Sequence, residues 1–343
     1  MENDLNVEKK KLQALNGSVA SVTVAYNAAR ILSRQMDALL RQTRPLQEII
    51  VVDNTSTDGT GAMLAERYPQ VTVLRMPENL GVAGGWAAGL SYAALERGHG
   101  WVWTFDQDSV PEATTLESLS EGLQELEGRE EKVGMVVPVA FHRETTAQYR
   151  AFLWRNGFVK PSAEQTREPI WFADMAIASG SLVPREVIQE VGVPRADFFM
   201  DISDFEYCLR IRSRGYKIAV ISRAKMSHEI GNTRKINLPG YKRLWIKQPP
   251  FREYYISRNL AYLAWRLYPN LATKISIARY LARHLAGVLL FSSDGLACAI
   301  RMVQGFGDGL RGRLGIRMRP KAQDFRKPGA ALTVAKKIEA GKG

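Results

Sequence analysis

The feature that most constrains the fold is a regular alternation of β-rich runs and helical patterns between residues 19 and 105. The β-rich runs are apolar and bounded by turn residues, whereas the segments between them repeat apolar residues every three or four positions. Strands that alternate with helices in this way form an α/β fold with a mostly parallel, doubly wound sheet flanked by helices. The predicted strands are 19–25, 48–52, 71–74 and 101–105, and the predicted helices are 31–42, 58–68 and 85–97.

Polar residues and glycines directly follow all four predicted strands. Parallel strands end at the same edge of a sheet, and open α/β sheets bind their ligands outside that edge. We therefore expect these segments to face one ligand together. They are Tyr26 and Asn27 after the first strand, Asp53 and Asn54 after the second, Asn79, Gly81, Gly84 and Gly85 after the third, and Asp106, Gln107 and Asp108 after the fourth.

The fourth strand is aromatic and ends abruptly in two carboxylates, Asp106 and Asp108. Carboxylate oxygens at this position are suitable ligands for Mg²⁺ or Mn²⁺ on a diphosphate. The alternative is local: Ser109-x-x-Glu112 with Pro111 is typical of the start of a helix. Both interpretations remain open from this segment alone.

The glycine segment after the third strand is not a dinucleotide fingerprint, because it follows the wrong strand and contains no G-x-G-x-x-G. Its glycines allow the backbone to approach a phosphate or ribose at a helix N-terminus, or they form a tight loop with close helix–sheet packing. Asp53 has two interpretations as well. It accepts hydrogen bonds from a pyrimidine N3–H or a ribose hydroxyl, or it forms an Asx-turn into the helix near Asp58.

The order of these motifs resembles family-2 glycosyltransferases of the GT-A fold. The resemblance covers roughly residues 18–230 and specifies the fold and reaction type more than the sugar. Within the family the chain looks most like bacterial rhamnosyltransferases, in which Asp-Gln-Asp-Ser is a frequent metal motif, and next like galactofuranosyltransferases. The matching segments are 24–27, 51–60, 79–85 and 105–109, with a weaker likeness at 254–259 and 307–313.

The resemblance implies an inverting transfer of a sugar from a nucleotide diphosphate to an acceptor hydroxyl. It assigns the general base to Asp204 and a divalent cation, Mg²⁺ or Mn²⁺, to Asp106, Asp108 and His228. It places the donor against the residues at the strand ends, with acceptor or supporting roles for others. The donor set is Tyr26, Asn27, Asp53, Asn54, Asn79, Gly81, Gly84, Gly85, Asp106 and Gln107, and the acceptor or support set is Trp171, Ser179, Gly180 and Glu206.

Each of the later residues also has a structural interpretation. Ser203-x-x-Glu206 forms a capping box, and Asp204 then lies in the first helical turn, where the helix dipole keeps it ionised. His228 ends the predicted strand 217–221 with its extension to 227, and a lone histidine is usually structural. Trp171 packs in the core or lines an acceptor groove.

Two related enzyme classes are disfavoured. A sugar-nucleotide pyrophosphorylase requires a glycine- and arginine-rich phosphate loop after its first strand, where this chain has Tyr-Asn-Ala-Ala at 26–29. A processive polysaccharide synthase requires membrane spans and a Gln-x-x-Arg-Trp motif, which the sequence lacks. The Ala-Ser-Gly-Ser segment at 178–181 does not fit the nucleophile elbow of a serine hydrolase.

Charge is concentrated in the C-terminal part. Residues 1–239 carry 27 Lys and Arg against 30 Asp and Glu, whereas residues 240–320 carry 14 against 3, a net charge of +11. The segment 254–291 has helical periodicity with arginines between its apolar residues, which favours an anionic membrane surface. The alternatives are helices that pack on the main domain with a solvated basic face, or that form a homo-oligomer. Nucleic acid is disfavoured because no reader module is present.

We predict an N-terminal extension (1–17), a GT-A catalytic domain (18–240), a basic helical region (241–320) and a flexible tail (321–343) that includes a marginal helix at 330–340. The catalytic domain divides into a nucleotide-sugar half (18–110) and an acceptor half (111–240). Cys208 and Cys298 lack disulfide or metal spacing and are predicted structural thiols. Because no apolar run spans a bilayer, we expect a cytoplasmic protein, peripheral at the inner face of the cell membrane. The expected donor is dTDP-rhamnose, with UDP-sugars as the alternative, and the acceptor is a glycan or a lipid-linked glycan.

Overall fold

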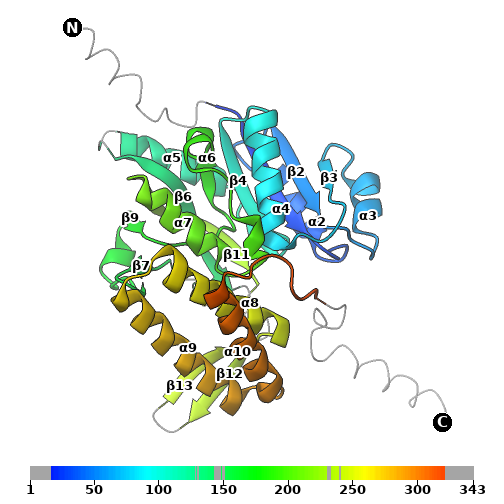
Figure 1. The fold of residues 1–343 in the computed structure, drawn as a ribbon. Coiled ribbons are helices and arrows are strands. Elements are labelled where there is room, and N and C mark those ends of the chain that lie inside the picture. Colours follow the sequence, from blue (N-terminus) through cyan, green and yellow to red (C-terminus); the bar gives the residue numbers. More distant parts are fainter. Residues whose placement is uncertain are drawn as a thin grey trace, which may run out of the picture.

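The computed structural model describes residues 17–127, 129, 131–142, 148, 151–229, 233–238 and 241–320. Nearly all of the predicted N-terminal extension, and the predicted tail with its helix at 330–340, lie outside the described residues. The described chain has an α/β part built on one large sheet and a layer of C-terminal helices against the carboxyl edge of that sheet (Figure 1).

The sheet has nine strands and is mostly parallel at its centre. Its order is β3-β2-β1-β4-β10-β6-β11-β5, and β9 also pairs with β11. The first four βα units are parallel, whereas β10 runs antiparallel between β4 and β6. The strands are β1 (Val19–Ala25), β2 (Glu48–Asp53), β3 (Thr72–Arg75), β4 (Trp101–Asp106), β5 (Ser109–Pro111), β6 (Val133–His142), β9 (Ile170–Ala173), β10 (Leu182–Pro184) and β11 (Lys217–His228).

Helices cover both faces of this sheet, which is why β1 is buried along its whole length. One face packs a core with α4 and α7, and the other packs a core with α2 and α5. The predicted α/β architecture is therefore confirmed. The flanking helices are α2 (Leu32–Leu40), α3 (Thr60–Arg67), α4 (Gly81–Leu90) with a π-helical extension (Ser91–Glu96), α5 (Thr115–Glu127), α6 (Arg185–Val191) and α7 (Ser203–Ser213), with 3₁₀ turns at Gln165–Arg167 and Ala196–Phe198.

Helix α4 begins at Gly81, four residues before the predicted start. Gly84 and Gly85 therefore lie inside the helix and are buried. A Cβ on Gly85 would approach Val24 Cγ1 to 2.6 Å, and a Cβ on Gly89 would approach Val22 Cγ1 to 2.3 Å. These glycines let α4 lie directly on β1, which is the close helix–sheet packing that the sequence left open.

The helix start at Ser109, one of the two interpretations that the sequence left open, is not formed. Residues Ser109–Pro111 form β5, which pairs antiparallel with the end of β11, and α5 starts only at Thr115. The local Ser-x-x-Glu pattern is overridden because the edge of β11 offers backbone partners; the N–H of Glu112 also donates to the carbonyl of Lys225. A long-range pairing has replaced a local cap.

The C-terminal region is helical from Pro250 to Arg311 and has a small core of its own, but the first residues of the region predicted as helical, Tyr241–Ile246, form strand β13 in a hairpin. Among the described residues, no helix is both long and apolar enough to span a bilayer. Cys208 and Cys298 are buried free thiols. The helices are α8 (Pro250–Tyr262) with a π-helical end (Leu263–Leu267), α9 (Leu271–Phe291) and α10 (Gly295–Arg311), and two small hairpins accompany the fold, β7 (Leu153–Trp154) with β8 (Phe158–Val159) and β12 (Thr233–Leu238) with β13 (Tyr241–Ile246).

Candidate active site

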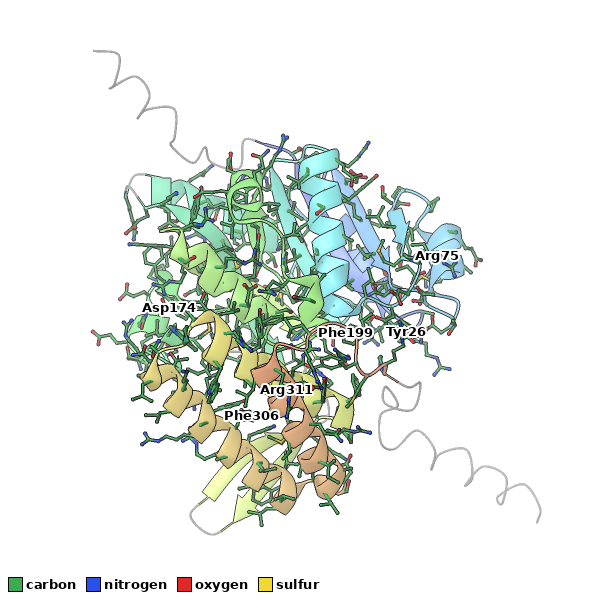
Figure 2. All side chains as sticks on the ribbon, in the orientation of Figure 1. Tyr26, Arg75, Asp174, Phe199, Phe306 and Arg311 are labelled. Carbon is green, nitrogen blue, oxygen red and sulfur yellow. The ribbon has the colours of Figure 1, made fainter. Side chains whose placement is uncertain are left out.

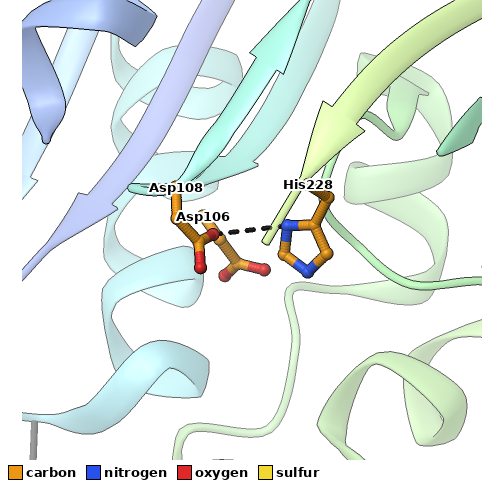
Figure 3. A group of neighbouring side chains, drawn as sticks. All are labelled: Asp106, Asp108 and His228. Atoms are coloured by element: carbon orange, nitrogen blue, oxygen red, sulfur yellow. Dashed lines mark ion pairs between the residues drawn. The ribbon is translucent and has the colours of Figure 1, made fainter. Parts of the chain in front are cut away.

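Two strand ends bring three ligand-type side chains together. Asp106 is the last residue of β4, and a two-residue turn follows it before β5. The register of β5 against β11 sets His228 directly opposite Ser109. As a result, one ligand atom from each of Asp106, Asp108 and His228 lies within 4.8 Å of the others (Figure 3).

Buried hydroxyl and amide groups hold this turn in place. The side chain of Gln35 donates to the carbonyls of Asp106 and Ser109, both at 2.6 Å. Ser179 accepts from the N–H of Asp106 at 3.0 Å, and Ser109 Oγ lies 2.6 Å from both Ser179 Oγ and His228 Nδ1. Ser179 therefore supports the turn. Gln35 is not among the predicted site residues, although a polar residue at a core-facing position of α2 is a signal for it.

The three side chains fit a divalent cation electrostatically. Burial raises the pKa of Asp106 to about 6, with His228 opposing and Asp108 adding to this shift. Burial alone would lower the pKa of His228, but the contact with Asp108 and its negative charge outweigh it and raise that pKa. Asp108 Oδ1 is buried, lies 3.3 Å from His228 Nδ1 and accepts no well-aligned hydrogen bond. Such an oxygen fits a cation, and two carboxylates with an imidazole suit Mn²⁺ or Mg²⁺.

The residues after β1 and β2 are hydrogen-bonded to this turn and to each other. The side chain of Gln107 accepts from the N–H of Tyr26 at 2.7 Å, and Ser56 Oγ accepts from the N–H of Asn27 at 2.9 Å. Asp53 is 1 % exposed and accepts from the N–H of Ser56, three residues on, at 2.9 Å. The two-residue Asx-turn into α3 is made instead by Asp58, which accepts from the N–H of Thr60 at 3.1 Å. The segments after β1, β2 and β4, which are predicted to bind the sugar donor, are thus connected by hydrogen bonds along one edge of the sheet, as the order of the strands predicts.

The segment before α4 is fixed from both sides. Asn54 donates to the carbonyl of Gly81 at 2.9 Å, and Asn79 accepts from the N–H of Gly81 at 2.8 Å. Gly81 has φ +71°, and a Cβ there would lie 2.1 Å from the carbonyl oxygen of Phe199. This is a position that only glycine can occupy. Figure 2 shows Phe199 where this segment meets the C-terminal helices.

The loop before α7 is backbone-strained and ends at the predicted base. Phe199, Asp201 and Ile202 all have φ between +55° and +63°, which is rare for residues with a Cβ. Asp204 follows in the first helical turn and accepts from the N–H of Phe205 at 2.9 Å. Burial raises its pKa to about 7, and the charges of Asp106 and Asp201 add to the shift. The helix dipole expected to keep Asp204 ionised is thus opposed by removal of the carboxyl group from water, which raises the pKa.

The predicted capping box is not formed. Ser203 is already helical, Ile202 is the N-cap, and no side chain caps the helix. Glu206 instead receives two hydrogen bonds of 3.0 Å from Arg210 one turn later. The reason is that the left-handed backbone of Ile202 turns the chain into the helix one residue early.

Trp171 and Gly180 both lie in the packed interior of the α/β part. Trp171 is 6 % exposed and belongs to the core, the alternative that the sequence left open. Gly180 has φ +81°, and its carbonyl accepts from the indole of Trp103 at 2.9 Å.

Helix α8 supplies site residues that the sequence did not single out. Arg252 forms an ion pair with Asp201 and lies close enough to Asp106 and Asp108 to act on their charges. Arg258 and Asn259 are fully buried and donate to backbone carbonyls of the loop before α7. The segment 254–259, similar to rhamnosyltransferase C-terminal regions, was the signal. The accepting carbonyls are those of Asp197, Phe198 and Gly315 for Arg258, and of Phe198, Met200 and Asp201 for Asn259.

The site is that of a known class of transferase. Residues 21–192, half of the chain, match the model of glycosyl transferase family 2, and the chain belongs to this family. A dTDP-rhamnosyl transferase of Shigella flexneri, RfbF, is 25 % identical over 88 % of this chain and 98 % of its own length. A galactofuranosyltransferase of Mycolicibacterium smegmatis, GlfT1, is 24 % identical over 71 % of this chain and 82 % of its own.

Solved structures agree on the fold. GalNAc-T7 with UDP, GalNAc and Mn²⁺ matches with a TM-score of 0.56 at 14 % identity, over 86 % of this chain and 56 % of that one. TarS of S. aureus in complex with UDP matches with a TM-score of 0.54 at 13 % identity, over 86 % of this chain and 82 % of that one. At such identities the likeness establishes the GT-A type fold alone.

Proposed function

We propose that the chain is an inverting, cation-dependent rhamnosyltransferase that uses dTDP-rhamnose and a glycan or lipid-linked hydroxyl acceptor in the synthesis of a cell-surface polysaccharide. The convergence of Asp106, Asp108 and His228 at the carboxyl edge of the sheet is the observation that supports it most. The relative RfbF, a dTDP-rhamnosyl transferase matched along nearly its whole length, supports the sugar. UDP-galactofuranose is the second candidate donor, supported by the likeness to GlfT1.

The chain's residues divide the work of the transfer. A divalent cation held by Asp106, Asp108 and His228 would neutralise the charge that builds on the leaving diphosphate. Asp204 removes the proton from the acceptor hydroxyl as that oxygen attacks the anomeric carbon from the face opposite the leaving group. One displacement of this kind inverts the anomeric centre and needs no covalent enzyme intermediate.

The strand-end residues hold the donor in this scheme. Asp53 and the backbone near Tyr26 and Asn27 bind the base and ribose, and Gly81 acts by letting the start of α4 lie against Phe199. Gly84 and Gly85 act through the packing that brings α4 to the edge. Gln107 contributes by fixing the backbone of Tyr26 rather than by binding the cation.

The sugar and the cation are tested together. A panel that includes dTDP-rhamnose and UDP-galactofuranose is assayed for binding and nucleotide release, with Mn²⁺, with Mg²⁺ and with excess EDTA. We expect preference for dTDP-rhamnose and loss of activity in EDTA. A preference for UDP-galactofuranose would assign the chain to the second candidate, and full activity in EDTA would contradict the cation.

The site residues are tested with matched variants. Asp108→Ala should abolish cation-dependent donor binding, because Asp108 Oδ1 is the buried oxygen without a well-aligned hydrogen bond. Glu121→Ala on the exposed side of α5 removes a carboxylate far from the strand ends and should bind donor normally. Equal donor binding by both variants would contradict the site.

A further inference from the structure

The most exposed apolar side chains of the molecule gather in two helices. Among the described residues, every large apolar side chain that is at least half exposed lies in α9 or α10. Elsewhere the most exposed is Leu95, at 47 %. The side chains in question are Leu271 (72 %), Leu289 (52 %), Leu290 (74 %), Leu296 (71 %), Ile300 (50 %) and Val303 (66 %).

Five of these six side chains lie on the two sides of the connection between the end of α9 and the start of α10. Leu289 and Leu290 end α9, and Leu296, Ile300 and Val303 recur at four and three residues along the first half of α10. That spacing puts the three on one stripe of the helix. We call these five residues the α9–α10 corner; it lies at the end of the molecule away from β2, β3 and α3 (Figure 1).

A basic surface adjoins the corner along α9. Ala272, Ile275, Ala282 and Leu289 are exposed at helical spacing, and Arg279 and Arg283 lie exposed between them. Neither arginine has an acidic partner among the described residues. The whole region 240–320 has a net charge of +11.

We propose that the α9–α10 corner docks on an anionic lipid bilayer, with its leucines in the acyl boundary and Arg279 and Arg283 at the headgroups. Apolar side chains flanked by arginine are complementary to such a surface in both hydrophobicity and charge. A second copy of this chain is a less suitable partner for the corner, because pairing two corners would bring two strongly positive regions together.

The corner is connected to the active site through a short piece of chain. Lys247 contacts Ser293 and Asp294 between α9 and α10, and the thiol of Cys298 donates to the carbonyl of Gln248. Arg252, a few residues further along, pairs with Asp201 beside the carboxylates. A lipid-linked acceptor in a bilayer at the corner would be brought to the side of the molecule from which this segment runs to the active site. The role of the docked bilayer in supplying a lipid-linked acceptor rests on the proposed function, whereas the docking itself does not depend on that function.

The test is flotation of the purified full chain with two kinds of vesicle. One contains equal parts of phosphatidylglycerol and phosphatidylcholine, and the other contains phosphatidylcholine alone. We expect binding to the anionic vesicles that weakens as salt is raised, and at least tenfold weaker binding to the neutral ones. Equal binding to both, or to neither, would overturn the proposal.

Two double variants locate the contact. Leu290→Ser with Leu296→Ser, and Arg279→Gln with Arg283→Gln, should each weaken binding to anionic vesicles at least tenfold. The matched control is Leu40→Ser with Leu95→Ser, which removes two exposed leucines from the catalytic part and should bind as the unchanged chain does. If the corner variants bind vesicles normally, another basic segment carries the binding and the proposal is wrong.

Two further measurements separate the outcomes. Sedimentation velocity on the unchanged chain and on the leucine variant detects self-association; a dimer that the variant abolishes would assign the corner to a second copy and overturn the bilayer. Nucleotide release from dTDP-rhamnose with a water-soluble acceptor should be unchanged in the corner variants. Loss of vesicle binding with retained release isolates the docking surface, whereas absence of release in the unchanged chain counts against the proposed function alone.

Discussion

Helices α8 and α9 have the same kind of sequence and opposite environments. Both repeat apolar residues every three or four positions with arginines between them. In α8, however, Arg258 is fully buried against carbonyls of the loop before α7, whereas in α9 Arg279 and Arg283 are exposed. The difference teaches that a basic amphipathic pattern predicts a helix but not what its arginines contact.

The physical reason lies in the partner each helix meets. Helix α8 packs beside the loop before α7, in which three residues have left-handed backbone, and the carbonyls of Asp197 and Phe198 at its start accept hydrogen bonds from Arg258. Buried carbonyls need donors, and a guanidinium can serve several at once. Helix α9 packs its inner face against α10, α8 and the hairpin at Phe158, for example through His284 on Glu253 and Tyr280 on Phe158, and its outer arginines remain in solvent.

The largest expected effect is on stability, from Arg258→Met. The substitution removes the fully buried donor that serves the carbonyls of Asp197, Phe198 and Gly315, so we expect a loss of roughly 3–5 kcal/mol in the free energy of unfolding. The matched Arg279→Met in α9 should change it by less than about 0.5 kcal/mol. Urea denaturation measures both. Equal losses would show that the two helices do not differ as described.

The second effect is on catalysis at the end of the loop that α8 holds. Asp204→Asn keeps the size of the side chain and removes the base, so turnover should fall about 10²-fold or more while donor affinity changes little. Steady-state kinetics and donor titration separate the two quantities. A comparable loss of donor binding would make Asp204 a ligand or structural residue instead.

The third effect is on pH dependence. Burial raises the pKa of Asp204 to about 7, and only the deprotonated carboxylate accepts a proton. Turnover should therefore fall about tenfold per pH unit below that pKa and be level above it. The residual rate of Asp204→Asn provides the control, since it should lack this step. An unchanged step in that variant would assign the titration to another group.

The smallest expected effect is at the α9–α10 corner. Leu290 and Leu296 are 74 % and 71 % exposed, so replacing each with serine removes almost no buried area. We expect the free energy of unfolding to change by less than about 0.5 kcal/mol. Thermal or urea unfolding measures it. A loss of several kcal/mol would show that the corner packs against something in the free protein.

Much of the site was predictable because it depends on chain order. Parallel strands must end at one edge, so the residues after β1, β2 and β4 had to converge whatever the details of packing. Asp106, Asp108 and the segments at Tyr26 and Asp53 follow from that rule. His228 required the resemblance to the family, since nothing local distinguishes it from a structural histidine.

Local patterns failed at three positions. Ser109 begins a strand because β11 lies beside it, and the raised pKa of Asp204 depends on burial by other elements, so in both cases a long-range contact overrode a local rule. The capping box at Glu206 failed for a local reason, because Ile202 starts α7 one residue early and Arg210 lies one turn further on.

By itself, the sequence determined the α/β class, the position of the carboxylates at a strand end and the helical, basic C-terminal region, because these depend on periodicity and order along the chain. Only the tertiary structure decided that Gln35 and Ser179 hold the turn, that Arg258 and Asn259 hold the loop before Asp204, and that α9 faces solvent. Those contacts join residues tens of positions apart, and no periodicity encodes which buried carbonyl a distant donor will meet.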